Sequence, residues 1–159
     1  MKQEFHLPFT EFPIPVPSEA FPGERSIALP VLPIVLVEKK AKRGFQTLSL
    51  LDSGADRCVF PALFGREIGL NVEAGKKAQV VGVGGLDVAY FHNVVIQFSL
   101  VGRSYHYSCY AGFSTALDQL GFGLLGRHGF FDVFEDVSFD TKRKLVRLVA
   151  EIDEPGSKS

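Results

Sequence analysis

A carboxylate at position 52 follows directly on an apolar run. The run reads Leu50-Leu51-Asp52-Ser53-Gly54-Ala55, so a strand is expected to deliver Asp52 to the end of a buried element. Carboxylates are seldom placed there without a partner or a task, and a positioned carboxylate can act as a general acid or base. The tripeptide Asp-Ser-Gly is also a common turn, in which the Asp side chain caps the local backbone. Taken alone, it favours the turn.

Two further motifs stand later in the chain. Val81-Gly82-Val83-Gly84-Gly85 lies between two apolar segments, Ala78–Val81 and Leu86–Phe91, and this pattern predicts a hairpin with a glycine-rich tip. Leu124-Leu125-Gly126-Arg127 leads into an expected short helix through about Phe131. In their order along residues 30–150, the three motifs resemble those of the retroviral-type (retropepsin-like) aspartic proteases.

The resemblance implies a fold, an activity and a stoichiometry. The fold is mostly β, a closed β-barrel-like acid protease fold of a single lobe with one or two short helices. It supplies one catalytic carboxylate, here Asp52, and the chain has no second Asp-Ser/Thr-Gly. A homodimer is therefore required, in which Asp52 of each chain meets at a twofold axis. Two such carboxylates share a proton and activate a water to hydrolyse a peptide bond, with no metal or other cofactor.

The resemblance also assigns supporting roles around the carboxylate. Ser53 braces the loop across the dimer axis, Gly54 lets the substrate backbone approach, and Ala55 leaves room beside the cleft. Asp56 and Arg127 form an ion pair that ties the loop to the following helix, and a bidentate geometry suits the guanidinium.

The glycine-rich hairpin tip is expected to be a flap that binds substrate, formed by Val81, Gly82, Val83, Gly84 and Gly85. Glycine supplies the freedom to open for a polypeptide and to close against water; the plain alternative is an ordinary hairpin turn.

The residue after Arg127 departs from the family pattern. The family has Asp or Asn there, whereas this chain has His128, whose imidazole can supply some of the same hydrogen bonds.

Other catalytic arrangements find little support. Ser53 or Ser104 with His92 or His106 lacks a Gly-x-Ser-x-Gly elbow. The four histidines lack zinc-site spacing, and no Gly-Lys-Ser/Thr follows the glycines as in a phosphate loop. The rival function is a retropepsin-like dimerisation or peptide-binding module with little or no hydrolysis. A further alternative is a monomer that becomes active only when its N-terminal arm is processed.

The remaining chain is predicted from strand patterns and prolines. Pro61 is expected to open a helix that runs to about Ile68 and stops at Gly69. Five prolines within residues 1–24 predict an extended N-terminal arm, followed by the protease-like domain over 25–150 and a polar tail over 151–159. The strands are expected at Val31–Glu38, Phe45–Leu51, Cys58–Phe60, Ala78–Val81, Leu86–Phe91, Asn93–Leu100, Ser104–Tyr110, Val137–Phe139 and Leu145–Val149.

Composition is typical of a soluble globular protein, with 159 residues that are 46% hydrophobic and 22% charged. Because the chain has 17 basic and 18 acidic residues, no strong electrostatic field is expected to hold nucleic acid or an anionic membrane. A signal-peptide pattern and an apolar run of membrane length are both missing, so we expect a cytoplasmic protein. Cys58 and Cys109 are interpreted as separate small hydrophobes in a reducing compartment, with a disulfide left open. The expected partners are a second copy of the chain and a polypeptide substrate.

Overall fold

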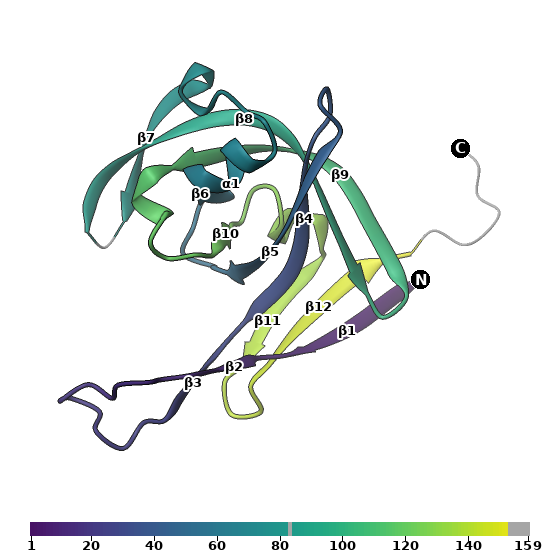
Figure 1. The fold of residues 1–159 in the computed structure, drawn as a ribbon. Coiled ribbons are helices and arrows are strands. Elements are labelled where there is room, and N and C mark those ends of the chain that lie inside the picture. Colours follow the sequence, from purple (N-terminus) through teal and green to yellow (C-terminus); the bar gives the residue numbers. More distant parts are fainter. Residues whose placement is uncertain (83, 153–159) are drawn as a thin grey trace. The chain divides into compact units, whose positions relative to one another are not determined.

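The computed structural model describes residues 1–82 and 84–152. The chain divides into two compact units, one formed by residues 1–31 together with the chain from Phe134 onward, the other by Leu32–Val133 (Figure 1). The first unit contains β1 (Lys2–Pro8), β2 (Thr10–Pro13), β3 (Ser26–Leu29), β11 (Asp136–Asp140) and β12 (Leu145–Glu151). The second contains β4 (Val31–Glu38, which begins at the boundary), β5 (Arg43–Leu51), β6 (Val59–Pro61), α1 (Ala62–Glu67), η1 (Val72–Ala74), β7 (Lys76–Gly82), β8 (Gly85–Leu100), β9 (Arg103–Ser114), η2 (Thr115–Leu117), β10 (Gly123–Leu125) and η3 (Phe131–Val133), where η denotes a 3-10 helix.

The second unit is a closed barrel of mixed strands. Its strands follow the order β4-β5-β10-β6-β9-β8, and β4 pairs with β8 to close the ring, while β7 extends the sheet from β8. Strand β10 is parallel to β5, and β6 is parallel to β9, whereas β8 is antiparallel to β4, β7 and β9. The mostly β, closed barrel expected from the resemblance is confirmed. None of the helices within the described residues is long and apolar enough to cross a membrane.

The closing register places large apolar side chains inside the barrel. Leu36 of β4 lies opposite Ile96 of β8, and both side chains are fully buried. Strand β4 has the bounds that its sequence predicted. Pro61 precedes α1 at its N-cap, and Gly69 follows the helix with φ of +91°, a conformation that a side chain disfavours.

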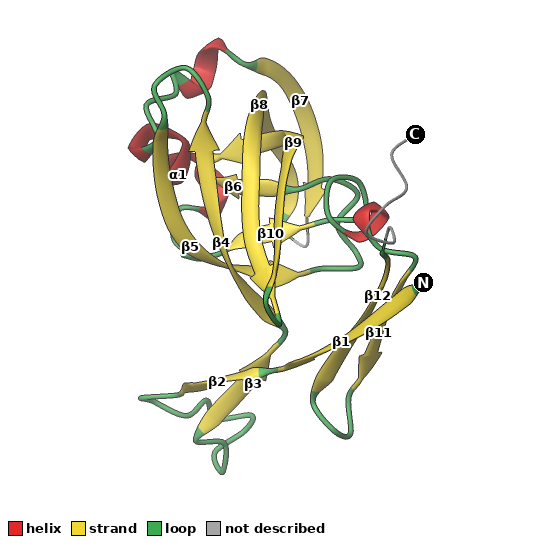
Figure 2. Ribbon diagram, turned by 90° about the vertical axis from the view of Figure 1, so that its right-hand side faces the viewer, coloured by secondary structure: helices red, strands yellow, loops and turns green. Residues whose placement is uncertain are grey.

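Strand β8 is longer than its sequence indicates. The segments Leu86–Phe91 and Asn93–Leu100 were predicted as separate strands, but the structure joins them in one 16-residue strand. The strand changes partners instead of breaking. On one edge it pairs with β7 through Phe91 and then with β4 at 95–97, and on the other edge it pairs with β9 from Tyr90 onward (Figure 2). The β7–β8 hairpin therefore continues beyond the part of β8 that pairs with β9.

The first unit is a separate antiparallel sheet of order β1-β12-β11, with β2 and β3 paired alongside each other as a hairpin. Its buried side chains include Phe5, Val146 and Leu148. The predicted strands Val137–Phe139 and Leu145–Val149 lie within β11 and β12. Residues 1–24, expected as an extended arm, contain β1 and β2; β1 lies at the sheet edge, where a proline such as Pro8 is tolerated.

The prediction of a helix directly after Gly126-Arg127 is wrong. A single 3-10 turn, η3, forms later in the chain. Gly129 has φ of +106°, which a right-handed helix cannot contain, so the backbone turns before η3 begins.

We expect Leu36→Ala to lower the free energy of unfolding by about 2–5 kcal/mol, because it leaves a cavity where β4 meets β8. The matched control is Leu86→Ala, whose side chain is 68% exposed, and we expect a change within about 0.5 kcal/mol. Urea denaturation followed by circular dichroism measures both variants. Equal destabilisation by the two would contradict the closed register.

Candidate active site

The loop that carries Asp52 is positioned by a strand inserted between the two strands that the loop connects. The loop joins β5 to β6, and β10 lies between these strands, parallel to β5 and antiparallel to β6. Leu125 is opposite Leu51 in this pairing. The ladder continues one residue further, because the backbone N–H of Asp52 donates to the carbonyl of Leu125 at 3.0 Å. The structure thus brings the first and third sequence motifs together.

The next residues of both motifs also run side by side. The N–H of Arg127 donates to the carbonyl of Ala55, and the N–H of His128 donates to that of Asp56, each at 2.9 Å. This close approach requires glycine at position 126, since a Cβ there would lie 2.4 Å from the carbonyl oxygen of Arg57. Backbone contacts therefore fix the loop against residues 126–128.

The Asp52 carboxylate makes the local turn contact that the tripeptide alone predicted. Its Oδ1 accepts the N–H of Gly54 at 2.9 Å, and its carbonyl accepts the N–H of Ala55 at 3.1 Å. Its Oδ2 makes no hydrogen bond to any residue that the structure describes. The side chain is half-buried, and Ser53 and Gly54 are exposed. One carboxylate oxygen thus orders the loop.

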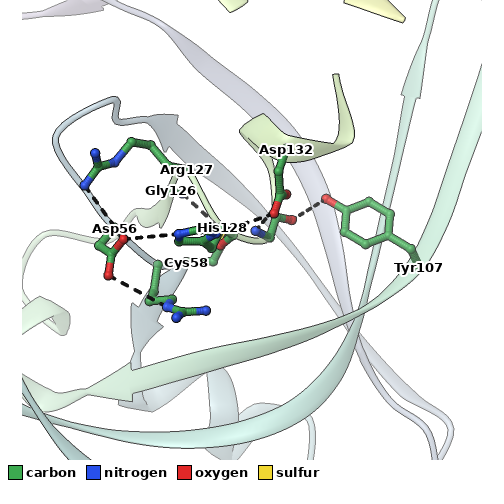
Figure 3. Close-up of polar contacts among 9 residues, drawn as sticks. Asp56, Cys58, Tyr107, Gly126, Arg127, His128 and Asp132 are labelled. Atoms are coloured by element: carbon green, nitrogen blue, oxygen red, sulfur yellow. Dashed lines mark hydrogen bonds and ion pairs between the residues drawn. The ribbon is translucent and has the colours of Figure 1, made fainter. Parts of the chain in front are cut away.

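Three cationic or titratable side chains surround Asp56 (Figure 3). Its Oδ1 lies 3.7 Å from Nη2 of Arg127 and 3.6 Å from Nε2 of His128, and its Oδ2 lies 3.8 Å from Nε of Arg57. The expected pair between Asp56 and Arg127 is present, but as a single contact and not as a bidentate one. Both side chains are mostly exposed, 64% for Asp56 and 59% for Arg127.

Two residues that the sequence did not single out complete this region. Asp132 lies with Oδ2 3.7 Å from Nδ1 of His128, and its Oδ1 accepts the N–H of Gly129 at 3.0 Å. The Tyr107 hydroxyl donates to the carbonyl of Gly129 at 2.8 Å, and burial raises the pKa of this phenol. Asp132 has a weak sequence signal, its four-residue spacing from His128. Tyr107 sits in an alternating strand and has none.

The predicted glycine-rich hairpin is the β7–β8 connection. Val81 pairs with Leu86 and Gly82 with Gly85, whose φ is +116°. Val81 and Leu86 are exposed, at 84% and 68%. Gly84 lies in the turn, and Val83 is outside the described residues. The hairpin is confirmed, and its role as a flap stays a prediction.

A metal centre is not formed within residues 1–82 and 84–152, where His, Cys, Asp and Glu side chains nowhere gather in groups of three or more that could hold an ion.

The exposed ion pair of Asp56 and Arg127 is expected to contribute little to stability. We expect a double-mutant cycle of Asp56→Ala and Arg127→Ala to give a coupling energy of about 0.2–1 kcal/mol, because solvent screens both charges. Urea denaturation of the four proteins measures it, and the parallel cycle with Arg57→Ala serves as the control. A coupling above about 2 kcal/mol would contradict the exposed geometry.

Comparison with known proteins places the fold. The sequence matches no protein-family model and no curated protein. A crystal structure of a retropepsin-like aspartic protease from Rickettsia conorii is similar with a TM-score of 0.54 at 12% identity, over 94% of this chain and 93% of that chain. EIAV protease in complex with an inhibitor matches at 22% identity over 62% of this chain and 82% of that chain, but its TM-score of 0.39 is too low to support an inference. The chain has the fold of the retropepsin-like aspartic proteases.

Proposed function

We propose that the protein is an aspartic endopeptidase whose active site is completed by a second copy of the chain. The observation that carries the proposal is the position of Asp52 within the retropepsin-like fold. The residue stands at the end of β5, in a loop held by β10, with its carboxylate half-buried. A turn capped by an Asp side chain can form without a strand inserted beside it. The insertion of β10 therefore favours a role in acid–base chemistry over a purely structural one.

The chemistry follows from two carboxylates at a twofold axis. Two such groups a few ångströms apart cannot both ionise cheaply, so the pair holds one proton; aspartic proteases are the standard example of this effect. The ionised Asp52 takes a proton from a water as the water attacks the peptide carbonyl. The protonated partner donates to the developing oxyanion and then helps the amine to leave. Neither a metal nor a covalent intermediate takes part.

The hydrogen bond from Gly54 supports this role. The N–H of Gly54 holds Oδ1 of Asp52 in place, so the carboxylate is oriented before substrate arrives. Ser53 is exposed next to it, where its hydroxyl can brace the loop against the second copy. The Gly54 carbonyl is an acceptor for the substrate backbone.

The substrate is proposed to be an extended polypeptide. An extended chain can pair with neighbouring backbone as an added strand. The β7–β8 hairpin, with its glycines and its exposed Val81 and Leu86, supplies a flap whose apolar side chains can cover that chain. Closing over the peptide would exclude water from the carboxylates.

We expect Asp52→Asn to lower the cleavage rate of an unfolded protein by about 10²–10⁴-fold, because an amide can neither give nor take the proton. The assay is run between about pH 4 and 7, where a carboxylate pair sharing a proton is active.

The matched control for this variant is Asp140→Asn. Asp140 also accepts a backbone N–H through Oδ1 at 2.9 Å, from Arg143, so the two substitutions keep equivalent turns. Undiminished cleavage by the Asp52 variant would overturn the catalytic assignment. Peptide binding by a folded wild-type protein that shows no turnover would favour the binding-module alternative.

The shared site predicts that activity depends on association. We expect specific activity to fall on dilution in step with the dimer fraction seen by analytical ultracentrifugation. Adding excess Asp52→Asn chain to wild type should suppress cleavage, because mixed dimers carry one carboxylate. The Asp140→Asn chain is the control for this mixing. A fully active monomer would refute the two-chain site.

A further inference from the structure

The two cysteines form a buried pair behind the Asp52 loop. Cys58 immediately precedes β6 and Cys109 lies in β9, and both are free and buried. Their sulfurs converge on Gly129: a Cβ at that position would lie 2.7 Å from Sγ of Cys109 and 3.1 Å from Sγ of Cys58. Because both sulfurs approach the same point beside Gly129, the two thiols are near neighbours. A disulfide between them needs no second chain.

The surroundings of the pair favour its ionisation at Cys58. The S–H of Cys109 lowers the pKa of the Cys58 thiol, and the N–H of Gly126, which donates to its Sγ at 3.4 Å, adds to this effect. The same contact between the thiols raises the pKa of Cys109. Asp132 opposes ionisation of both thiols, while Arg57 favours that of Cys109. The pair therefore loses one proton as a unit and shares the one that remains.

One of the two cysteines, Cys109, lines a pocket, and Cys58 does not. The pocket has a volume of about 260 Å³, and its lining includes Cys109, Tyr107, His128 and Asp132. Cys109 is 4% exposed, whereas Cys58 is fully buried. Cys109 is therefore the cysteine that a small molecule in this pocket would meet first.

We propose that Cys58 and Cys109 are a modification site at which a small hydroperoxide closes an intramolecular disulfide. The proton that the pair keeps moves to Cys58, and the Cys109 thiolate attacks the peroxide. The O–O bond breaks, Cys109 becomes a sulfenic acid, and the departing hydroxide takes the Cys58 proton and leaves as water. Cys58 then attacks the Cys109 sulfur, the S–O bond breaks, and a second water leaves. Two thiols and one hydrogen peroxide thus give one disulfide and two waters.

Oxidation changes the segment that holds the Asp52 loop. In the reduced protein, Sγ of Cys58 accepts the N–H of Gly126 and donates to the carbonyl of His128 at 3.6 Å. A disulfide has no S–H, and its sulfurs must come to about 2.05 Å from each other, so the contact to His128 is lost and that to Gly126 is weakened. Residues 126–128 carry the backbone bonds to Ala55 and Asp56. The expected effect on cleavage rests on the proposed function; the disulfide itself does not.

The test treats the full-length wild-type chain with a small excess of hydrogen peroxide and maps its disulfides. Trypsin cuts after Arg57, Arg66, Arg103 and Arg127, so the two cysteines fall in different peptides, 58–66 and 104–127. We expect these peptides joined, in a monomeric chain lighter by two hydrogens, and separated again by dithiothreitol. Three results would overturn the proposal: both thiols remain reduced, Cys109 becomes a sulfinic acid without joined peptides, or the only disulfides link two chains.

Two further readouts test the consequence for the loop. In the oxidised protein, we expect the amides of residues 126–128 to exchange hydrogen about tenfold faster, because the His128 carbonyl has lost the Cys58 S–H and the Gly126 N–H is held more weakly. Joined peptides with unchanged exchange would overturn the coupling to the loop. Peroxide should also lower cleavage by the wild type and not by Cys109→Ala. If the disulfide forms and exchange rises but the reduced protein cleaves nothing, the dithiol stands and the proposed function fails.

Discussion

The insertion of β10 between β5 and β6 is the constraint on which the candidate site depends. A strand of three residues, Gly123–Leu125, pairs on both edges, so the loop that carries Asp52 must pass around its end. Every buried backbone group in this position needs a partner, and the bonds from Asp52, Arg127 and His128 supply them. The glycines make the insertion sterically feasible: a Cβ at Gly123 would lie 2.2 Å from the ring of Phe60.

Backbone packing, and not surface charge, therefore holds the loop. The contacts of Asp56 with its neighbours span 3.6–3.8 Å and involve exposed side chains, so each is expected to contribute less than about 1 kcal/mol. The buried Cys58 thiol and the Tyr107 hydroxyl also bond to the backbone of residues 126–129. Because a buried polar group left unpaired is costly, the loss of one of these hydrogen bonds is expected to destabilise the loop more than the loss of a surface ion pair.

The proposed chemistry is divided between two levels of structure. One chain orients a carboxylate through Gly54 and leaves its second oxygen for reaction, yet a lone carboxylate has no neighbour with which to share a proton. Association of two chains would supply the second carboxylate. The dithiol contacts residues 126–129, so a proposed change in its oxidation state would act through the backbone contacts of this segment.

The sequence alone determined the features whose causes are local. The apolar run Val31–Glu38 predicted β4, and glycines predicted the β7–β8 hairpin. The resemblance of three short motifs, in their order, to a known family indicated the fold. Only the tertiary structure decided that β8 runs unbroken by changing partners, that Gly129 replaces the expected helix with a turn, and that Cys58 meets Cys109. These depend on contacts between segments far apart in the chain, and short-range propensity carries no information about which distant strand lies alongside.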